Sequence, residues 1–257
     1  MLRKYSLFIS LLVSVSIIAC LTFSAQERNR VYMTPVTLWG DAASKSINKR
    51  RTHENYGQAL STAGAHAQSV SVSMSLYNEA LKEFDAVKAL RDDGSVPLRD
   101  LYREIGVVEF RVGLIDDAIT SWQTGLRYAP GDPSLLNNLS VAFIKKQRYD
   151  EAEAAVRQAL TVDPNMPHLL NTLGEILMVR GNYEEALKYF LAAIERGPDT
   201  PARYWNAAVA FEKTGQYDMA YAYASRFAAM ETNPEARQRA SAYLDRLQIF
   251  YLSKRKP

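Results

Sequence analysis

The stretch GDPSLLNNLSVAFIKKQRYDEAEAAVRQALTVDP, residues 131–164, decides the fold because the chain then repeats its plan. Residues 165–198, NMPHLLNTLGEILMVRGNYEEALKYFLAAIERGP, hold the same two apolar helical patterns and also end on a proline. Small residues and prolines recur every 34 residues in three series: Gly106, Ser140, Gly174 and Ala208; Ala118, Ala152, Ala186 and Ala220; and Pro130, Pro164 and Pro198. The stretch is therefore one copy of an internal repeat.

Each repeat is predicted to be a hairpin of two helices. In residues 133–166, Asp132 can cap the first helix, and Pro133 takes its first position, where a missing N–H costs nothing. Gln147 occupies the corner between the two helices, a position that suits a residue in the left-handed conformation. The sister repeats have glycine at this corner: Gly113, Gly181 and Gly215. A hairpin of this size cannot bury its apolar face alone, so successive hairpins must stack.

The repeat resembles the tetratricopeptide repeat (TPR). The residues that carry the resemblance are Tyr102, Ile105-Gly106, Gly113, Ala118, Trp122 and Pro130, and then Leu173-Gly174, Leu177, Gly181, Ala186, Phe190, Ala193 and Pro198. The resemblance implies an all-α fold, an α-solenoid in which helical hairpins form a right-handed superhelix. It divides residues 99–234 into four repeats: 99–132, 133–166, 167–200 and 201–234.

The two ends of the array depart from this pattern. Residues 34–98 are predicted to form a divergent first repeat, because Gly57 and Gly106 are 49 residues apart, 15 more than one period. No Gly or Pro falls between Gly64 and Gly94, so residues 61–90 form either one long helix or two helices with a Ser-rich joint. In either case we favour an enlarged hairpin. Residues 235–257 lack a second helix and are predicted to be a capping helix.

Residues 1–30 are predicted to be a membrane anchor or a signal segment. The 22 residues from Tyr5 to Gln26 carry no charge, enough to span a bilayer core of about 30 Å as a helix. Arg3 and Lys4 favour a cytoplasmic N-terminus. We favour a single-pass anchor in the bacterial inner membrane, with the repeats facing the periplasm. The alternatives are a lipoprotein signal, in which Cys20 would carry the lipid, and a cleaved secretory signal.

A second resemblance supports the anchor. The run RNRVYMTPVTLWGDAASKSINKRRTHENYGQAL, residues 28–60, resembles the segment that joins the last membrane helix to the periplasmic repeats in bacterial protein-mannosyltransferase-like membrane proteins. This chain would then keep the last span and the repeat tail without the catalytic membrane domain.

The composition and the motifs give no indication of catalysis. The 31 Lys and Arg residues are nearly balanced by 28 Asp and Glu residues, which argues against nucleic acid as a partner. Three scattered histidines and one cysteine do not suggest a zinc site, and no phosphate loop or nucleophile elbow occurs. The acidic pairs Asp116-Asp117 and Glu184-Glu185 fall at helix starts, where they favour the helix dipole. We therefore expect no enzyme, no cofactor and no metal.

The first helices are predicted to present one face to a partner. Their second, fifth, ninth and twelfth residues point away from the packing face, and asparagine occupies the sixth position in two of these helices. The predicted groove residues are Arg103, Val107, Phe110, Asn137, Asn138, Val141, Ile144, Asn171, Glu175, Met178, Trp205, Asn206 and Val209. An exposed apolar stripe among them would mark a binding site, and the asparagines could contact an extended peptide. Alternatively, the second helices or the C-terminal segment cover these residues.

In the family that the repeat resembles, the first helices line a concave face that generally binds a peptide or another protein. We therefore expect a membrane-tethered scaffold that binds a protein or peptide ligand in envelope assembly. Two alternatives are an accessory subunit of a membrane glycosyltransferase-type enzyme and a lipoprotein pilotin of a pilus or secretion system.

Overall fold

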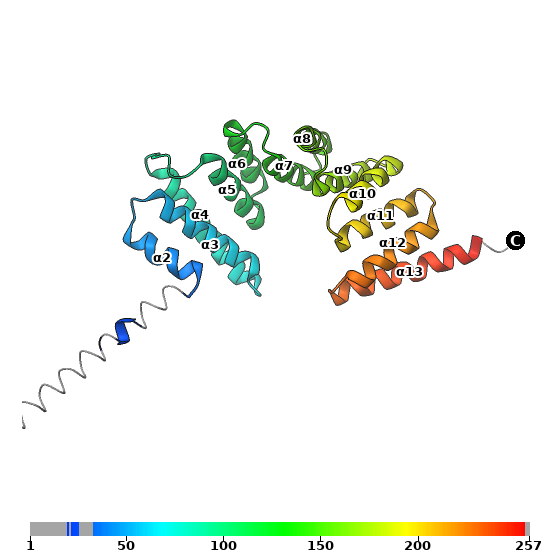
Figure 1. The fold of residues 1–257 in the computed structure, drawn as a ribbon, viewed down its shortest axis with the longest axis horizontal. Coiled ribbons are helices and arrows are strands. Elements are labelled where there is room, and N and C mark those ends of the chain that lie inside the picture. Colours follow the sequence, from blue (N-terminus) through cyan, green and yellow to red (C-terminus); the bar gives the residue numbers. More distant parts are fainter. Residues whose placement is uncertain (1–19, 21, 26–32, 255–257) are drawn as a thin grey trace, which may run out of the picture. The chain divides into compact units, whose positions relative to one another are not determined.

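The computed structural model describes residues 20, 22–25 and 33–254, and every regular element in these ranges is a helix (Figure 1). The all-α class is therefore confirmed. Cys20 is exposed, and none of the described helices has the length and apolar character needed to cross a bilayer. The rest of the predicted anchor, residues 1–19, 21 and 26–30, lies outside the described residues.

The chain divides into two compact units, Met1–Ala118 and Ile119–Pro257, called unit 1 and unit 2 below. The helices of unit 1 are α2 (Pro35–Lys45), α3 (Arg50–His66), α4 (Val70–Ala89) and α5 (Leu98–Val112). Helix α6 (Ile115–Tyr128) spans the boundary. The helices of unit 2 are α7 (Pro133–Lys145), α8 (Tyr149–Val162), α9 (Pro167–Val179), α10 (Tyr183–Arg196), α11 (Pro201–Lys213), α12 (Tyr217–Met230) and α13 (Pro234–Lys254).

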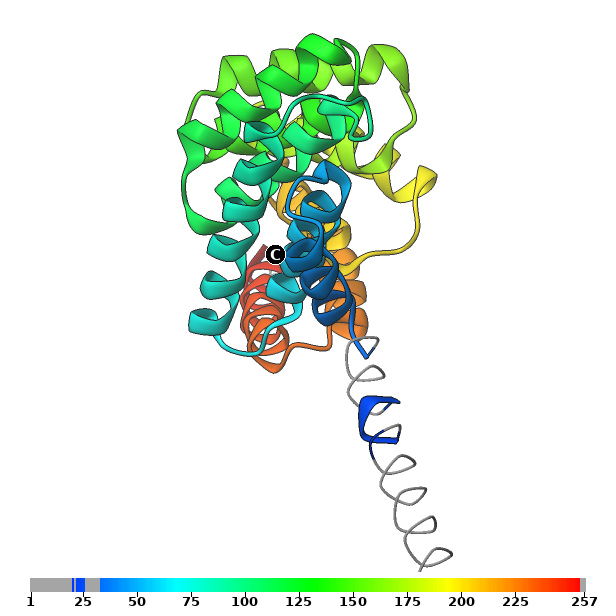
Figure 2. The same ribbon diagram turned by 90° about the vertical axis from the view of Figure 1, so that its left-hand side faces the viewer.

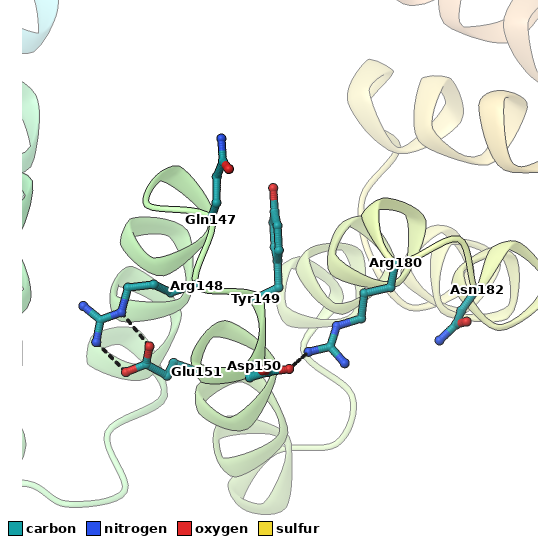
Figure 3. Close-up of a pocket in the computed structure, with 7 residues that line it drawn as sticks. All are labelled: Gln147, Arg148, Tyr149, Asp150, Glu151, Arg180 and Asn182. Carbon is teal, nitrogen blue, oxygen red and sulfur yellow. Dashed lines mark hydrogen bonds and ion pairs between the residues drawn. The ribbon is translucent and has the colours of Figure 1, made fainter.

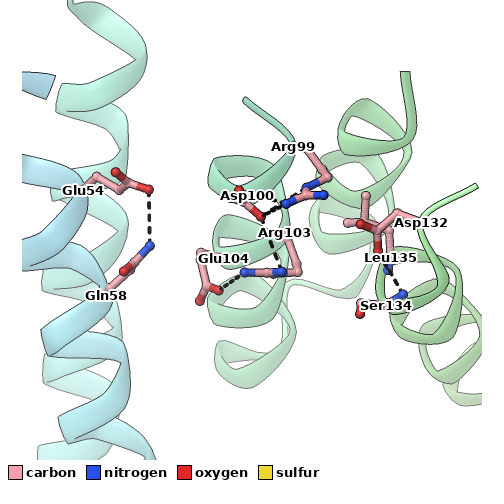
Figure 4. Close-up of polar contacts among 9 residues, drawn as sticks. All are labelled: Glu54, Gln58, Arg99, Asp100, Arg103, Glu104, Asp132, Ser134 and Leu135. Carbon is pink, nitrogen blue, oxygen red and sulfur yellow. Dashed lines mark hydrogen bonds and ion pairs between the residues drawn. The ribbon is translucent and has the colours of Figure 1, made fainter. Parts of the chain in front are cut away.

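Local sequence signals set the helix ends in unit 2. Helices α7, α9 and α11 each begin at a proline, and Asp132 Oδ1 accepts hydrogen bonds from the backbone N–H groups of Ser134 and Leu135 (Figure 4). Gln147 is the one described residue other than glycine with a positive φ, 60°. Gly181 and Gly215 have φ values of 80° and 79° at the matching corners. The predicted left-handed corners are therefore confirmed.

Small residues let the helices of unit 2 approach closely. A Cβ atom added to Gly174 in α9 would lie 2.5 Å from Cε1 of Phe190 in α10, and Phe190 is only 1% exposed. Ser140 and Ala208, which occupy the same repeat position, are fully buried. Gly174 therefore lies where the Phe190 ring leaves no room for a larger side chain, and the small residues of α7 and α11 are buried at the matching position.

Helix α13 ends the array of unit 2. It packs against α12, beside which it lies in both views (Figures 1 and 2). Ala240 and Leu247 are buried on this side, whereas Arg237 and Ser241 are exposed. A polar outer surface is what a terminal helix requires in order to stay soluble.

Unit 1 holds the enlarged hairpin. Residues 50–89 form two helices, α3 and α4, joined by Ala67, Gln68 and Ser69, so the chain does not continue as one long helix. Phe84 and Leu60 lie in the core between these helices. Arg50 is buried, and its Nε donates to the Val87 carbonyl while Nη1 pairs with Asp92.

Candidate functional site

The face built by the first helices of unit 2 is the candidate site, called the first-helix face below. It comprises the predicted residues of α7, α9 and α11: Asn137, Asn138, Val141, Ile144, Asn171, Glu175, Met178, Trp205, Asn206 and Val209. Every one of these side chains is half-buried or exposed. The small residues of the same helices, Ser140, Gly174 and Ala208, are buried on the other side, because a helix that packs along one stripe leaves the opposite positions accessible.

Amides and a carboxylate join α9 to α11 on this face. Asn171 Nδ2 donates to Glu175 Oε1 over 2.7 Å, one turn along α9. Asn206 Nδ2, on α11, donates to Asn171 Oδ1 over 3.1 Å and to Glu175 Oε1 over 2.9 Å. Sequence reasoning selected the three residues singly and missed this network, since Asn171 and Asn206 occupy different positions of their repeats.

Two further amides lie on α7. The Oδ1 atom of Asn137 is buried and has no hydrogen-bond partner among the described residues. Asn138, the next residue, is half-buried. A buried acceptor without a donor is uncommon in a folded protein, so Asn137 has hydrogen-bonding capacity that the described fold does not use.

Apolar side chains continue along the same three helices. Val141 is 38% exposed, and Ile144, Met178 and Val209 are half-buried. Glu175 interrupts the series between Val141 and Val209. The result is a partly accessible apolar strip beside the amides.

Helix α13 covers the α11 end of this face. The Trp205 ring lies 5.0 Å from the ring of Tyr243 and 5.0 Å from that of Phe227, centroid to centroid. The Tyr243 hydroxyl donates to Glu212 Oε2 over 2.8 Å, and Arg246 pairs with Glu212 at 2.9 Å. Burial, followed by the Glu212 hydrogen bond, raises the pKa of Tyr243. Tyr243 and Arg246 were not predicted as site residues, although their i, i+3 spacing placed them together on α13.

The remaining predicted residues, Arg103, Val107 and Phe110, lie on α5 in unit 1 and are half-buried. Arg103 is held by Asp100 at 3.4 Å and by Glu104 at 3.2 Å (Figure 4). Its guanidinium is therefore already engaged by carboxylates of its own helix. The first-helix face as defined above is confined to unit 2.

A separate hollow of about 530 Å³ lies at the corners of the α7–α8 and α9–α10 hairpins (Figure 3). Its lining is polar, and its charged groups pair with each other: Arg148 with Glu151, and Arg180 with Asp150. Both arginines of the lining are therefore already engaged by carboxylates, and exposed ion pairs of this kind contribute little energy.

Comparisons with known proteins agree with this architecture. Sequence profiles described as "Tetratricopeptide repeat" match residues 103–167 and 143–210. No curated protein matches the sequence. The chain therefore carries tetratricopeptide repeats over these residues.

Three solved structures are similar in fold. TTC0263, a thermophilic TPR protein of Thermus thermophilus, is 19% identical with a TM-score of 0.57 over 73% of this chain and 98% of that chain. MamA AMB-1 is 19% identical with a TM-score of 0.53, over 68% and 95%. YrrB, titled a TPR protein with an unusual peptide-binding site, is 18% identical with a TM-score of 0.51, over 79% and 97%. At these identities the likeness shows a shared fold, and that fold is the all-helical TPR solenoid.

Proposed function

We propose that this protein is a non-enzymatic scaffold that binds a peptide or protein segment on the first-helix face of unit 2. The observation that carries the proposal is the amide network of Asn171, Glu175 and Asn206. It lies on a face whose side chains are half-buried or exposed, and the same face carries the apolar strip and Asn137, whose Oδ1 has no partner among the described residues. Hydrogen-bonding groups that converge beside accessible apolar surface are the usual composition of a recognition site.

The chemistry of the face suits an extended segment. Asparagine both donates and accepts hydrogen bonds, as a peptide backbone does, so Asn138 and Asn206 can pair with a backbone laid along the three helices. Apolar side chains of that segment would cover Val141, Ile144 and Met178, and a methionine adapts its shape to different ligands. The Glu175 carboxylate favours a ligand with a basic group at this point.

The fold class supports this reading, because YrrB, which shares the fold, is described as having a peptide-binding site. For this chain, peptide binding is proposed from its own residues. No predicted groove residue of unit 2 is fully covered by the second helices.

The scaffold is further proposed to be tethered to the bacterial inner membrane through residues 1–30, with the repeats facing the periplasm. The support is the uncharged run from Tyr5 to Gln26 behind Arg3 and Lys4. Protease added to spheroplasts should digest the repeats, whereas protection of the repeats would place them in the cytoplasm. Mass spectrometry of the N-terminal fragment distinguishes this anchor from the alternative, an acylated Cys20.

The binding site is tested by Ile144→Asp combined with Met178→Asp. Crosslinking in intact membranes, followed by mass spectrometry, identifies the partner, and binding of that purified partner is then measured. We expect the double variant to lose binding and to keep its thermal midpoint, because both side chains are only half-buried and lie outside the buried core. Val179→Asp is the matched control, since Val179 adjoins Met178 in sequence but is 56% exposed and outside the predicted face.

Two results would contradict the proposal. One is undiminished binding by the double variant. The other is a double variant that melts far below the wild type, because the strip would then be part of the core. Asn206→Ala should weaken partner binding less than the double variant does, because it removes only the hydrogen bonds of one side chain.

A further inference from the structure

An apolar pocket in unit 1 has no role in the function proposed above. It lies between α2 and α3 and has a volume of about 420 Å³. Its lining includes Val36, Trp39, Asn55, Ala59, Thr62 and Ala63. Val36 and Trp39 come from α2 and the other four from α3.

The register of the repeats indicates which element would occupy this pocket. Helix α2 ends five residues before α3 begins, and α10 ends five residues before α11 begins. The pair α2 and α3 therefore corresponds to the pair α10 and α11. In this alignment Val36 matches Leu187 and Trp39 matches Phe190. On the next helix, Asn55 matches Asn206 and Ala59 matches Ala210.

In unit 2, two of the matching residues contact a first helix, α9. Phe190 lies against Gly174, and Asn206 bonds to Asn171 and Glu175. Leu187, Phe190 and Ala210 are 7%, 1% and 0% exposed.

In unit 1, the only helix that α2 contacts among those described is α3. Val36 and Trp39 are only half-buried. The pocket therefore has the position and the lining of a seat for a first helix, and none of the described helices of unit 1 takes it.

We propose that this pocket accepts an amphipathic α-helix from another protein, with Gly, Ala or Ser at the centre of its apolar face. The small residue is required because Gly57 and Gly174 both receive an aromatic ring at less than 3 Å from the position of a Cβ, and the Trp39 indole is larger than either phenyl ring. Asn55 would bind a polar side chain of that helix, as Asn206 binds Asn171.

None of the described residues supplies such a helix. The residue one period before Gly57 is Phe23, which is too large for this position and is 66% exposed. A second copy is also unsuitable, because the described small-residue faces of Gly57, Gly174 and Ala208 are buried in their own hairpins. The bound helix would complete the truncated first repeat in trans.

The test uses the full chain in mild detergent and a labelled synthetic peptide of residues 165–182, which contains the α9 sequence. We expect saturable binding by fluorescence anisotropy. Gly174→Leu in the peptide should weaken binding by about tenfold or more, since overpacking costs about 1–3 kcal/mol and 1.4 kcal/mol is tenfold. In the protein, Ala63→Glu should weaken binding similarly. Ala65→Glu is the control, because Ala65 is exposed on the same helix and is not part of the pocket lining.

Several outcomes would overturn the proposal. Equal binding of the two peptides, or unchanged binding by Ala63→Glu, would remove the pocket as the seat. If circular dichroism shows that the Ala63→Glu variant is unfolded, peptide binding is measured instead with Thr62→Arg, a substitution at the exposed rim of the pocket. If the peptide binds only after residues 1–32 are removed, the pocket is occupied by the chain's own N-terminal segment. If the protein forms a dimer that Ala63→Glu disrupts, the pocket is occupied by a second copy of the chain. Ile144→Asp with Met178→Asp should leave peptide binding unchanged, which separates this pocket from the first-helix face.

Discussion

The hairpin α3–α4 of unit 1 and the hairpin α9–α10 of unit 2 make the same central contact at different lengths. Gly57 faces Phe84 in the first and Gly174 faces Phe190 in the second, with the added Cβ at 2.6 and 2.5 Å from the ring. Helix α3 runs nine residues beyond its glycine and α9 runs five. Helix α4 begins 14 residues before its phenylalanine and α10 begins seven. The joint has three residues in both, so the extra length is entirely helical.

The added length repeats the contact. Gly64 lies seven residues after Gly57, Tyr77 lies seven before Phe84, and a Cβ on Gly64 would be 2.9 Å from Tyr77 Cε1. Seven residues are close to two helical turns, so both side chains return to the same face. The glycine–aromatic contact therefore fixes the register of both hairpins. In the long hairpin, four additional residues in α3 and seven in α4 make the same kind of contact a second time.

The largest loss of stability is expected from removing the phenylalanine ring that each hairpin has at this contact. Phe84→Ala and Phe190→Ala should each reduce the free energy of unfolding by about 3–5 kcal/mol, because both rings are fully buried. Urea unfolding followed by circular dichroism measures this, with Val179→Ala on the exposed surface as the control. A much smaller loss for Phe84→Ala would break the comparison, because the long hairpin would then be held by other contacts.

A smaller loss is expected from filling the space beside the ring. Gly57→Leu and Gly174→Leu should each destabilise the protein by about 1–3 kcal/mol or more, since the rings must move aside. Gly131→Leu is the control, because the nearest atom to its added Cβ is a Val162 methyl at 3.6 Å. If the Gly174→Leu variant melts like the wild type, the proposed register is wrong.

Shortening the long hairpin sharpens the comparison further. Deleting residues 63–66 and 70–76 removes the extension and leaves the Gly57–Phe84 contact and the joint in place. We expect the helical content per residue to be kept and the loss of stability to be smaller than that of Phe84→Ala. Deleting residues 78–88, the same number, removes Phe84 and should unfold unit 1. An unfolded product of the first deletion would show that the extension is required for folding.

The smallest effect concerns one position that differs between the two first helices. Glu54 in α3 matches Asn171 in α9, and burial raises the pKa of the Glu54 carboxyl above its usual range. The folded state then holds this proton more tightly than the unfolded state, so stability falls as pH rises through the raised pKa. Glu54→Gln should therefore raise the thermal midpoint slightly at neutral pH.

This gain should vanish below the ordinary glutamate pKa of about 4.3. Melting curves at several pH values measure the difference between the two proteins, and Glu184→Gln, on the exposed start of α10, is the control. A difference that grows as the pH falls would have the wrong sign and would refute the assignment.

The sequence by itself determined the features that depend on neighbouring residues in the chain. The 34-residue period placed the hairpins, the prolines marked the starts of α7, α9 and α11, and the corner position of Gln147 indicated its positive φ. Helical periodicity also selected candidate residues of the first-helix face, all of which are accessible in unit 2. These features follow from backbone preferences and from one helix turn, which a single sequence contains.

Only the tertiary structure decided how side chains from different helices meet. The Asn171–Glu175–Asn206 network requires the packing of α9 against α11, and the cover over Trp205 requires the docking of α13. The second glycine–aromatic contact of Gly64 and Tyr77, and the pocket beside Trp39, depend on where α3 lies against α4 and α2. Such contacts join residues up to 38 positions apart, and their geometry is set by the packing of whole helices, to which local backbone preferences contribute no information.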